Sequence, residues 1–256
     1  MADALMGEAG QASSTDVSAF YDEFVERQTR VGVNRRHEAI VAWLRRFGLR
    51  PDDRVLELGC GVGTVTQLVS AHLPQGSILG IDLSPRSIET ARERLASYEN
   101  VRFLAADVVA ADVDVGERFD VVLLPDVIEH IPLELHDALF ARVVSWVKPD
   151  GYVLLHYPNP HHLEWCHVHN PENLQIIDQP IHADVLLANA YRHGLYLSYY
   201  ERYSIWIREG DYIVAVLRPG DGVGEFTRLP QPRPSLFRRA KRRAKRAARR
   251  LRGRDR

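Results

Sequence analysis

The stretch Val55-Leu-Glu-Leu-Gly-Cys-Gly-Val-Gly-Thr64 decides the fold, because a short apolar run passes straight into three glycines at alternate positions. The apolar run predicts a buried strand, and the residues that follow the glycines predict a helix. Gly59, Gly61 and Gly63 have no Cβ, so the backbone can turn sharply and lie against a ligand. The next helix would point its first amide N–H groups at that ligand. We therefore expect a nucleotide-binding turn, with Glu57 adding an acidic group beside it.

The rest of the chain continues this alternation of strand and helix. The patterns predict strands at 54–58, 77–82, 101–105, 119–124 and 151–157, and helices at 63–73, 85–97 and 133–147. A further helix at 182–192 precedes two paired strands at 194–204 and 211–217, and Pro149-Asp-Gly151 is expected to turn into the fifth strand. Such an order predicts an α/β fold with a seven-stranded, mostly parallel sheet, helices on both faces and an antiparallel hairpin at one edge.

Acidic residues end two of the other predicted strands. Asp82 closes Ser77-Ile-Leu-Gly-Ile-Asp82, about 20 residues past the glycines, where an acid can accept hydrogen bonds from ribose hydroxyls. Asp107 closes the run that begins at Val101. The glycine spacing Gly-Cys-Gly-Val-Gly differs from the GxGxxG of dinucleotide-binding turns. Over residues 50 to 158 this set resembles the cofactor motifs of class I S-adenosylmethionine-dependent methyltransferases.

The resemblance implies a Rossmann-like fold with S-adenosylmethionine as the cofactor. Asp107 would then bond the amino group of adenine beside an apolar residue. The cofactor-binding residues that the resemblance implies are Glu57, Gly59, Cys60, Gly61, Gly63, Asp82, Leu83, Asp107, Val108 and Pro125. Taken singly, each part also has a structural interpretation, because a glycine turn can be only a tight connection and a strand-end aspartate only a helix cap.

The segment Leu123-Leu-Pro-Asp-Val-Ile-Glu-His-Ile131 resembles the fourth motif of small-molecule and quinone-type methyltransferases, which contains Glu-His. Methyl transfer from a sulfonium is an in-line displacement, so the enzyme must align the reactants and remove a proton from a hydroxyl. His130 is the candidate base, because imidazoles titrate near neutral pH. Asp126 is the alternative base, and His156 is a third candidate catalytic residue. Glu129 and His130 can instead only support the corner between strand and helix.

Residues 156–193 hold seven of the eleven histidines and follow the fifth strand, where loops of this fold close over an acceptor. We expect an acceptor loop region lined by these histidines, Tyr157, Asn159, Trp165 and Gln179, which suits a sugar, a glycan or another hydroxyl-bearing small molecule. His156-Tyr-Pro-Asn-Pro160 and Gln179-Pro-Ile-His182 are similar to segments of methyltransferases from polysaccharide and sugar-modifying clusters.

A divalent metal is the alternative interpretation of these histidines. Histidine together with Asp126, His182 and Asp184 would hold an ion that lowers the pKa of the acceptor hydroxyl. The spacing gives this interpretation little support, because His167-Val-His169 is expected to lie in a loop.

Length and composition predict one catalytic domain with appendages, since 256 residues with 45% hydrophobic content can fill one sizeable core. Cys60 and Cys166 are too few for a disulfide framework. No apolar stretch approaches 18 residues and the N-terminus lacks a signal-peptide pattern, so we expect a cytoplasmic chain. The expected parts are a disordered 1–15, lid helices at 16–49, a methyltransferase domain at 50–218, a proline-rich linker at 219–236 and a basic tail at 237–256.

The expected lid helices are split around Gly32-Val-Asn34 and precede the first strand. In the resembled family, helices in this place commonly cover the cofactor. Four polar side chains could then face the site, or else lie on a solvated helix face: Tyr21, Arg27, Arg30 and His37.

The net charge of −1 hides a strong asymmetry between the body and the tail. Residues 238–256 hold 12 of the 33 Lys and Arg and a single acid, which leaves 21 basic and 33 acidic residues in 1–237. Phe237, Ala240, Ala244, Ala248 and Leu251 recur at spacings of three and four, which predicts a cationic helix with a narrow apolar stripe. The tail therefore suits an anionic membrane surface at the inner face of the membrane, a phosphate backbone, or only a solubilising role.

Two classes of function fit the chain. The first is an O-methyltransferase for a sugar, glycan or other small molecule, with base or metal assistance. The alternative is an RNA or other nucleic-acid methyltransferase that uses the basic tail as a clamp. The acidic body and the absence of an Asn/Asp-Pro-Pro-Tyr/Phe motif, where the chain has Leu124-Pro-Asp-Val-Ile, argue against the second class. A cofactor sensor without catalysis is a third interpretation.

Overall fold

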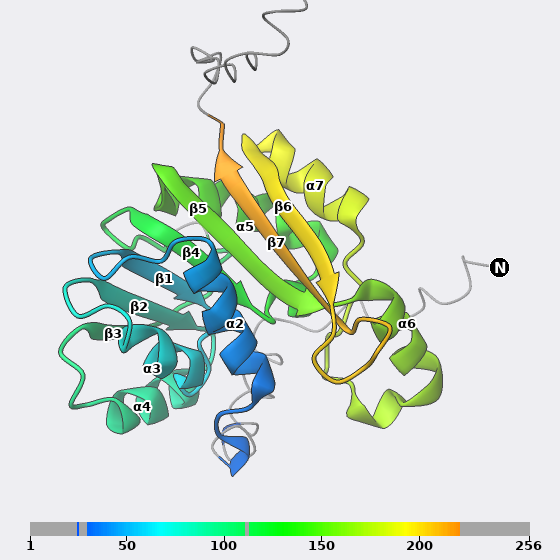
Figure 1. Ribbon diagram of the computed structural model, residues 1–256, viewed down its shortest axis with the longest axis horizontal. Helices are drawn as coiled ribbons and strands as arrows, with labels where there is room; N and C mark the ends of the chain where they lie inside the picture. The colour runs from blue at the N-terminus through cyan, green and yellow to red at the C-terminus, as the bar shows by residue number, and fades with distance from the viewer. Residues whose placement is uncertain (1–24, 26–29, 111–112, 221–256) are drawn as a thin grey trace, which may run out of the picture. The chain divides into compact units, whose positions relative to one another are not determined.

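The computed structural model describes Val25, residues 30–110 and residues 113–220, and these residues contain a seven-stranded sheet (Figure 1). Its strands lie in the order β3-β2-β1-β4-β5-β7-β6. The strands are β1 (Arg54–Leu58), β2 (Ser77–Asp82), β3 (Val101–Ala105), β4 (Phe119–Pro125), β5 (Val147–Pro158), β6 (Leu195–Tyr203) and β7 (Tyr212–Pro219). The α-helices are α2 (Arg35–Arg46), α3 (Thr64–Ser70), α4 (Pro85–Arg94), α5 (His136–Trp146), α6 (Pro160–His169) and α7 (Ala183–Arg192). Short 3₁₀ turns are η1 (Ile128–His130), η2 (Leu133–Leu135) and η3 (Pro171–Asn173).

The pairing of the strands confirms the predicted fold class. Strand β1 is parallel to both β2 and β4, so the chain reverses its direction of travel across the sheet beside β1. Strand β7 is antiparallel to both β5 and β6, which makes the predicted hairpin at one edge. In a parallel sheet, ligands bind outside the carboxyl ends of the strands at such a reversal. The glycine turn after β1 lies at this point.

Side chains that alternate along the central strands build two cores on opposite faces of the sheet. Val55 and Val121 pack with residues of α2 and α3, while their neighbours Leu56 and Val122 pack with residues of α5 and α7. Successive side chains of a strand point to opposite faces, so an unbroken apolar strand must be covered twice. The helices on both faces therefore follow from the strand composition (Figure 1).

Two element boundaries and one missed helix are the main differences from the sequence prediction. The helix expected at 133–147 begins with the 3₁₀ turn η2 before α5. Strand β5 begins at Val147 rather than at 151, because Pro149-Asp-Gly151 lies within the strand, at an irregularity in its register with β4. Residues 160–169, expected as a loop, form α6.

Helix α6 was missed because it has little apolar periodicity, with only Pro160 and Leu163 buried. Its start is set locally instead: the Asn159 side chain accepts the His161 N–H, and Pro160 occupies the first helical turn. The expectation that His167 and His169 lie in a loop was therefore wrong.

Of the expected lid, the structure describes α2. The Asn34 side chain caps this helix by accepting the N–H groups of Arg36 and His37, and Ile40 and Leu44 are fully buried. The preceding helix is almost wholly outside the described residues, as are 1–15, the linker beyond Gly220 and the basic tail. No helix in the described part of the chain combines the length and apolar character needed to span a membrane.

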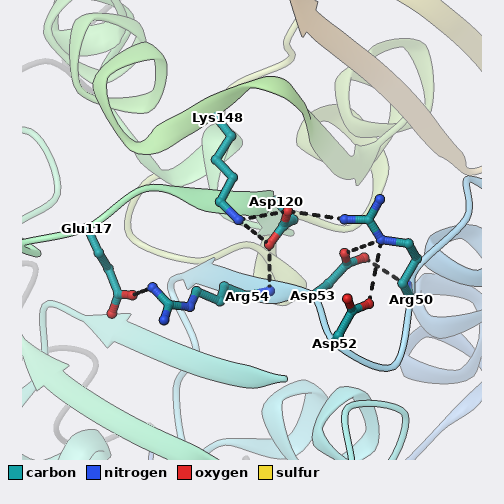
Figure 2. A network of polar contacts seen from close by, with 7 residues as sticks. All are labelled: Arg50, Asp52, Asp53, Arg54, Glu117, Asp120 and Lys148. Atoms are coloured by element: carbon teal, nitrogen blue, oxygen red, sulfur yellow. Dashed lines mark hydrogen bonds and ion pairs between the residues drawn. The ribbon is translucent and has the colours of Figure 1, made fainter. Parts of the chain in front are cut away.

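A polar network joins the amino ends of three neighbouring strands (Figure 2). The Asp120 carboxylate of β4 accepts the backbone N–H of Arg54 on β1 at 2.9 Å and Nζ of Lys148 on β5 at 2.8 Å. Nη2 of Arg50 lies 3.3 Å from the same carboxylate. Burial raises the pKa of Asp120, but these donors more than offset it and hold the pKa below its ordinary value.

Replacing Asp120 with Ala is expected to lower the free energy of unfolding by about 1–3 kcal/mol, because three donors lose a charged acceptor. Asp52→Ala is the matched control, since Asp52 is exposed and makes one loose ion pair with Arg50 at 3.7 Å. Its expected effect is within about 0.5 kcal/mol. Urea unfolding of both variants tests this, and equal losses would mean that the network adds nothing to stability.

Candidate active site

A cavity of about 520 Å³ lies at the carboxyl ends of β1, β2, β3 and β4. Nine of the ten residues expected to bind a cofactor line it: Glu57, Gly59, Cys60, Gly61, Asp82, Leu83, Asp107, Val108 and Pro125. The tenth, Gly63, is absent from its wall. Gly63 starts α3 with φ +77°, and a Cβ there would come within 3.1 Å of Leu95 and Phe103. The absence of a side chain at Gly63 therefore lets the start of α3 pack closely against Leu95 and Phe103.

The glycine turn adopts a backbone that side chains rarely tolerate. Gly59 has φ +69° and Gly61 has φ +52°, both in the left-handed region. A Cβ on Gly59 would lie 2.2 Å from Cγ2 of Val127. The turn therefore needs glycine both for its dihedral angles and for the close approach of the chain that follows β4.

Asp82 holds this turn from the neighbouring strand. One carboxylate oxygen accepts the Gly61 N–H at 2.7 Å, and the other accepts the Ser84 N–H at 2.9 Å. A carboxylate offers about four acceptor sites, so holding the turn is compatible with accepting bonds from a ligand in the cavity. Asp107, one strand further, accepts the N–H of Val109 at 3.0 Å.

Glu57 is the buried acid of the cavity wall. It is 1% exposed, and one of its carboxyl oxygens lies 2.6 Å from the hydroxyl of Thr66. Burial raises the pKa of Glu57 to about 8, and the charge of Asp82 acts in the same direction. Near pH 7 and in the absence of ligand, this acid is therefore mostly protonated.

The raised pKa of Glu57 predicts a pH-dependent stability of the ligand-free protein. A folded-state pKa above the unfolded value stabilises the fold below the unfolded value of 4.5, and this contribution is lost as the pH rises through about 8. Glu57→Gln should remove up to about 1.4 kcal/mol per pH unit from the slope of unfolding free energy between those values. Urea unfolding across this range measures the slope. Glu89→Gln, at an exposed helix position, should leave the slope unchanged, and an unchanged slope in Glu57→Gln would show that Glu57 is ionised.

Asp126, which follows β4 and lines the same cavity, lies at the centre of a polar chain. Its Oδ2 is 3.2 Å from Nε of Arg36, and its Oδ1 is 2.8 Å from Nδ1 of His156. Among the described residues, Asp126 is the one non-glycine residue with a positive φ, which is +55°. Burial raises its pKa, but Arg36 and then His156 more than offset this, so the pKa lies below its ordinary value. Asp126 is therefore held as a carboxylate that pairs with Arg36.

His156, the third candidate catalytic residue, is fully buried and does not line the cavity, so the structure does not place it where a substrate would contact it. Its Nε2 lies 2.6 Å from the hydroxyl of Tyr203, and its ring stacks on Tyr212 at 4.7 Å between centroids. The residue lies within β5, and its side chain reaches Asp126 rather than the open cavity. It positions Asp126.

His130, in η1, lines the cavity and has its ring orientation set by its neighbours. Its Nδ1 lies 2.6 Å from the carbonyl oxygen of Ile177 and 3.2 Å from Oδ1 of Asp178. Because both of these groups accept, the proton belongs on Nδ1. Nε2 is then the basic nitrogen, and the amide Nε2 of Gln175 lies 3.2 Å from it.

The predicted histidine-lined acceptor region is wrong in its details. Of residues 156–193, Gln175 lines the described cavity, and none of the seven histidines does. Tyr157 is buried in the core, Asn159 caps α6, and Gln179 bonds the backbone of Ile131 and Leu133. Trp165 is 47% exposed and stacks on His169. The region fails to line the site because four of its seven histidines are on α6, outside the cavity wall.

The metal alternative is also corrected. Within residues 30–110 and 113–220, the metal-ligating side chains that come together are His161, Glu164 and His182, without Asp126 or Asp184.

Several residues of the wall could not be assigned from the sequence. Arg36 from α2, Gln175 after η3, Trp206 between β6 and β7, and Tyr212 at the start of β7 all line the cavity. The expected His37 lines it too, whereas Arg30 does not, and Tyr21 and Arg27 are outside the described residues. Tyr212 pairs with Pro158 across the antiparallel edge, which is a long-range register that local patterns do not encode.

The wall fits a nucleoside-type group at one end. Acidic side chains stand at the ends of three neighbouring strands, the glycine backbone leaves room that a Cβ would fill, and Leu83 and Val108 supply apolar surface. The volume falls within the range of about 300–1,000 Å³ typical of ligand pockets. Asp82 and Asp107 are the side chains placed to hold such a group, with the backbone of Gly59 and Gly61 beneath it.

Comparison with known proteins agrees with this geometry. Residues 56–153 match the family described as "Methyltransferase domain". The chain is 30% identical over 141 residues to trans-aconitate 2-methyltransferase of Paracidovorax citrulli, covering 55% of this chain and 49% of the relative. It is 30% identical over 140 residues to a probable cobalt-precorrin-6B C(15)-methyltransferase of Thermoplasma acidophilum, covering 50% of this chain and 67% of the relative.

A solved structure shares the fold. Magnesium protoporphyrin IX methyltransferase from Synechocystis, with bound S-adenosylmethionine, matches with a TM-score of 0.59 at 19% identity, covering 82% of this chain and 99% of that one. The chain spans about half the length of the first curated relatives that it matches. The family match, the relative covered over two thirds of its length and the shared fold agree, and the chain belongs to the class I S-adenosylmethionine-dependent methyltransferases.

Proposed function

We propose that the cavity binds S-adenosylmethionine and that the protein transfers its methyl group to an oxygen atom of a small molecule. The observation that carries this proposal is that one cavity is lined both by Asp82 and Asp107, which suit a nucleoside, and by the polar side chains of His130 and Arg36. The names of two similar proteins, which refer to trans-aconitate and to magnesium protoporphyrin, support a small acceptor.

In the proposed reaction the cofactor supplies an electrophilic methyl group, and the protein supplies alignment and a base. Nε2 of His130 would take the proton of the acceptor hydroxyl while the new C–O bond forms and the C–S bond of the cofactor breaks, which would leave S-adenosylhomocysteine as the second product. Asp178 and the Ile177 carbonyl keep the other ring proton in place and stabilise the imidazolium that forms. Ile131 and Leu135 give the wall its apolar surface, which excludes water from the reacting atoms.

A sugar or glycan hydroxyl is the proposed finer acceptor. In place of the expected Trp165, Trp206 and Tyr212 supply the aromatic surface of the cavity, and Gln175 supplies an amide. Aromatic faces with a few directed polar groups are suited to stack on and orient a sugar ring. This assignment also accommodates the similarity of the residues around 156–160 and 179–182 to polysaccharide-modifying methyltransferases.

The test is methyl transfer from radiolabelled S-adenosylmethionine by the purified full chain. A glycan and lipid-linked saccharide fraction, a mixture of small hydroxy and carboxylic acids, and total RNA are offered separately, each with and without a chelator. Label in the saccharide fraction supports the finer proposal, and label in the acids supports the coarser one alone. Label confined to RNA overturns both and favours the tail as a nucleic-acid clamp. Loss of activity with the chelator would indicate that a metal ion, and not a histidine base alone, assists the reaction.

We also propose that the chain works in the cytoplasm and that the basic segment 237–256 brings it to the anionic inner face of the membrane. The twelve basic residues of 238–256 would each contribute about 1 kcal/mol near anionic headgroups. Deleting 238–256 should abolish co-sedimentation with phosphatidylserine vesicles and leave turnover of a soluble acceptor unchanged. Vesicles of neutral lipid are the control, and undiminished binding by the deleted chain would place the contact elsewhere.

A further inference from the structure

A cluster of three potential metal ligands lies outside the cavity, where the proposed function does not use it. His161 and Glu164 are three residues apart on α6, and His182 is the residue before α7. The Glu164 carboxylate contacts both imidazoles, with Oε2 at 3.1 Å from Nδ1 of His161 and Oε1 at 2.8 Å from Nε2 of His182. None of the three lines the cavity. The cluster therefore connects α6 to the first residue before α7.

The geometry of the cluster matches the ligand set of a borderline divalent ion. One nitrogen from each histidine and one carboxylate oxygen all lie within 4.8 Å of one another. Ligands about 2.0–2.1 Å from a tetrahedral ion are about 3.3 Å apart, and each imidazole lies about that far from one of the two oxygens of the same carboxylate. The two imidazole rings meet edge to face, with centroids 5.4 Å apart.

Two imidazoles and one carboxylate are a donor set that suits Zn²⁺ rather than Mg²⁺ or Ca²⁺, which prefer oxygen ligands. The side chains are 71%, 46% and 38% exposed in chain order, so an ion can enter from solvent and keep water as its fourth ligand. Without an ion, the two contacts between the Glu164 carboxylate and the imidazoles contribute little to stability, because solvent screens their charges.

The position of the cluster gives an ion there a structural consequence. Helix α6 buries only Pro160 and Leu163, and its exposed surface carries Trp165 and Val168. Few apolar contacts therefore hold it against the rest of the protein. Ligands supplied by α6 and by the residue before α7 would connect this helix to α7, which is well packed through Leu186 and Ala190.

We propose that His161, Glu164 and His182 bind a Zn²⁺ ion that fastens α6 to the start of α7. The ion stabilises the segment that leads from β5 to Gln175, the residue of this region that lines the cavity. It takes no part in the chemical step, since its ligands lie outside the cavity wall. The site is independent of the acceptor and of methyl transfer.

The test is Zn²⁺ titration of the full chain, purified and then stripped of metal, by isothermal calorimetry. One equivalent of Zn²⁺ is expected to bind. We expect Zn²⁺ binding to weaken by more than about 100-fold in each of three variants: His161→Ala, His182→Ala and Glu164→Gln. Loss of a residue that only supports a metal ligand typically costs roughly 10- to 100-fold, and loss of a ligand itself should cost more. Zn²⁺ at about 100 times its dissociation constant should raise Tm by roughly 5 °C in the unsubstituted chain and not in these variants.

Two matched controls separate this site from other histidines. His72→Ala removes an exposed histidine elsewhere, and His162→Ala removes the neighbour on α6 whose Nε2 lies 3.6 Å from Sγ of Cys166. Both should bind Zn²⁺ as the unsubstituted chain does. The absence of Zn²⁺ binding, unchanged affinity in the three ligand variants, or loss of binding in His162→Ala would each overturn the proposal.

A second measurement locates the effect within the structure. Hydrogen exchange should slow in α6 when Zn²⁺ is added, and Mg²⁺ should cause no such change. This readout needs neither cofactor nor acceptor, so a failed methyl-transfer assay leaves it standing. Slowed exchange confined to regions other than α6 would contradict the proposed fastening.

Discussion

Replacing His130 with Ala should lower kcat by roughly 10²- to 10⁴-fold, which is the contribution typical of a positioned general base. The affinity for S-adenosylmethionine should remain nearly unchanged, because His130 is not among the residues expected to bind the cofactor. The physical reason is the tautomer: the Ile177 carbonyl and Asp178 hold a proton on Nδ1, which leaves Nε2 to accept the proton of the acceptor. Single-turnover kinetics with an acceptor found by the labelling assay would measure the loss.

Controls keep this result specific to the base. His130→Gln retains a polar side chain, so its turnover should fall like that of His130→Ala while its Tm stays closer to that of the unsubstituted chain. His193→Ala removes a histidine that pairs with Asp137 outside the cavity, and it should leave kcat unchanged. Full activity in both His130 variants would remove His130 from the reaction. It would leave Asp126 or a metal to assist.

Replacing Asp82 with Ala should raise the dissociation constant of the cofactor by roughly 10- to 100-fold, or about 1.4–2.8 kcal/mol. Two effects add in this position. The ribose hydroxyls lose a charged acceptor, and the Gly61 and Ser84 N–H groups lose the carboxylate that holds the glycine turn. Calorimetric titration with S-adenosylhomocysteine measures the change without requiring an acceptor.

Asp82→Asn separates these two effects. The amide oxygen can accept one of the two backbone N–H groups, so part of the turn is retained while the charge is lost. An intermediate affinity is expected. Asp52→Ala, in the exposed network at the opposite ends of the strands, is the control and should leave affinity unchanged. Unchanged affinity in both Asp82 variants would take Asp82 out of the cofactor site.

Nine of the ten residues predicted to bind the cofactor line one cavity, for a physical reason. Apolar strands and the glycines that follow them are local signals, and parallel strands bring their carboxyl ends to one edge. Glu57, Asp82 and Asp107 are therefore neighbours in space as soon as the strand order is known. Gly63 is outside the cavity wall because the same turn also has to pack α3, and that contact depends on Leu95 and Phe103 from elsewhere in the chain.

The acceptor end was predictable only in part. The sequence indicated that His130, after the fourth strand, lies at the cavity, but the contacts of its neighbours depend on distant residues. Arg36 from α2 holds Asp126 as a carboxylate. His156 lies in β5, which pairs with β7, and its side chain contacts Asp126 instead of the cavity. Arg36 and Asp126 are 90 positions apart in the sequence. The residue types alone therefore could not show that Arg36 lowers the pKa of Asp126.

By itself, the sequence determined the order of the strands and of the described helices other than α6, the two-sided core and the glycine turn with its acids, because each depends on neighbours within one or two turns of chain. Tertiary structure alone decided which side chains form the rest of the cavity wall. It placed Gln175, Trp206 and Tyr212 there and kept the seven histidines out. It also brought His161 and Glu164 of α6 to His182. The physical reason is that helix α6 starts from a local cap without an apolar stripe, so only packing could show which way its side chains face.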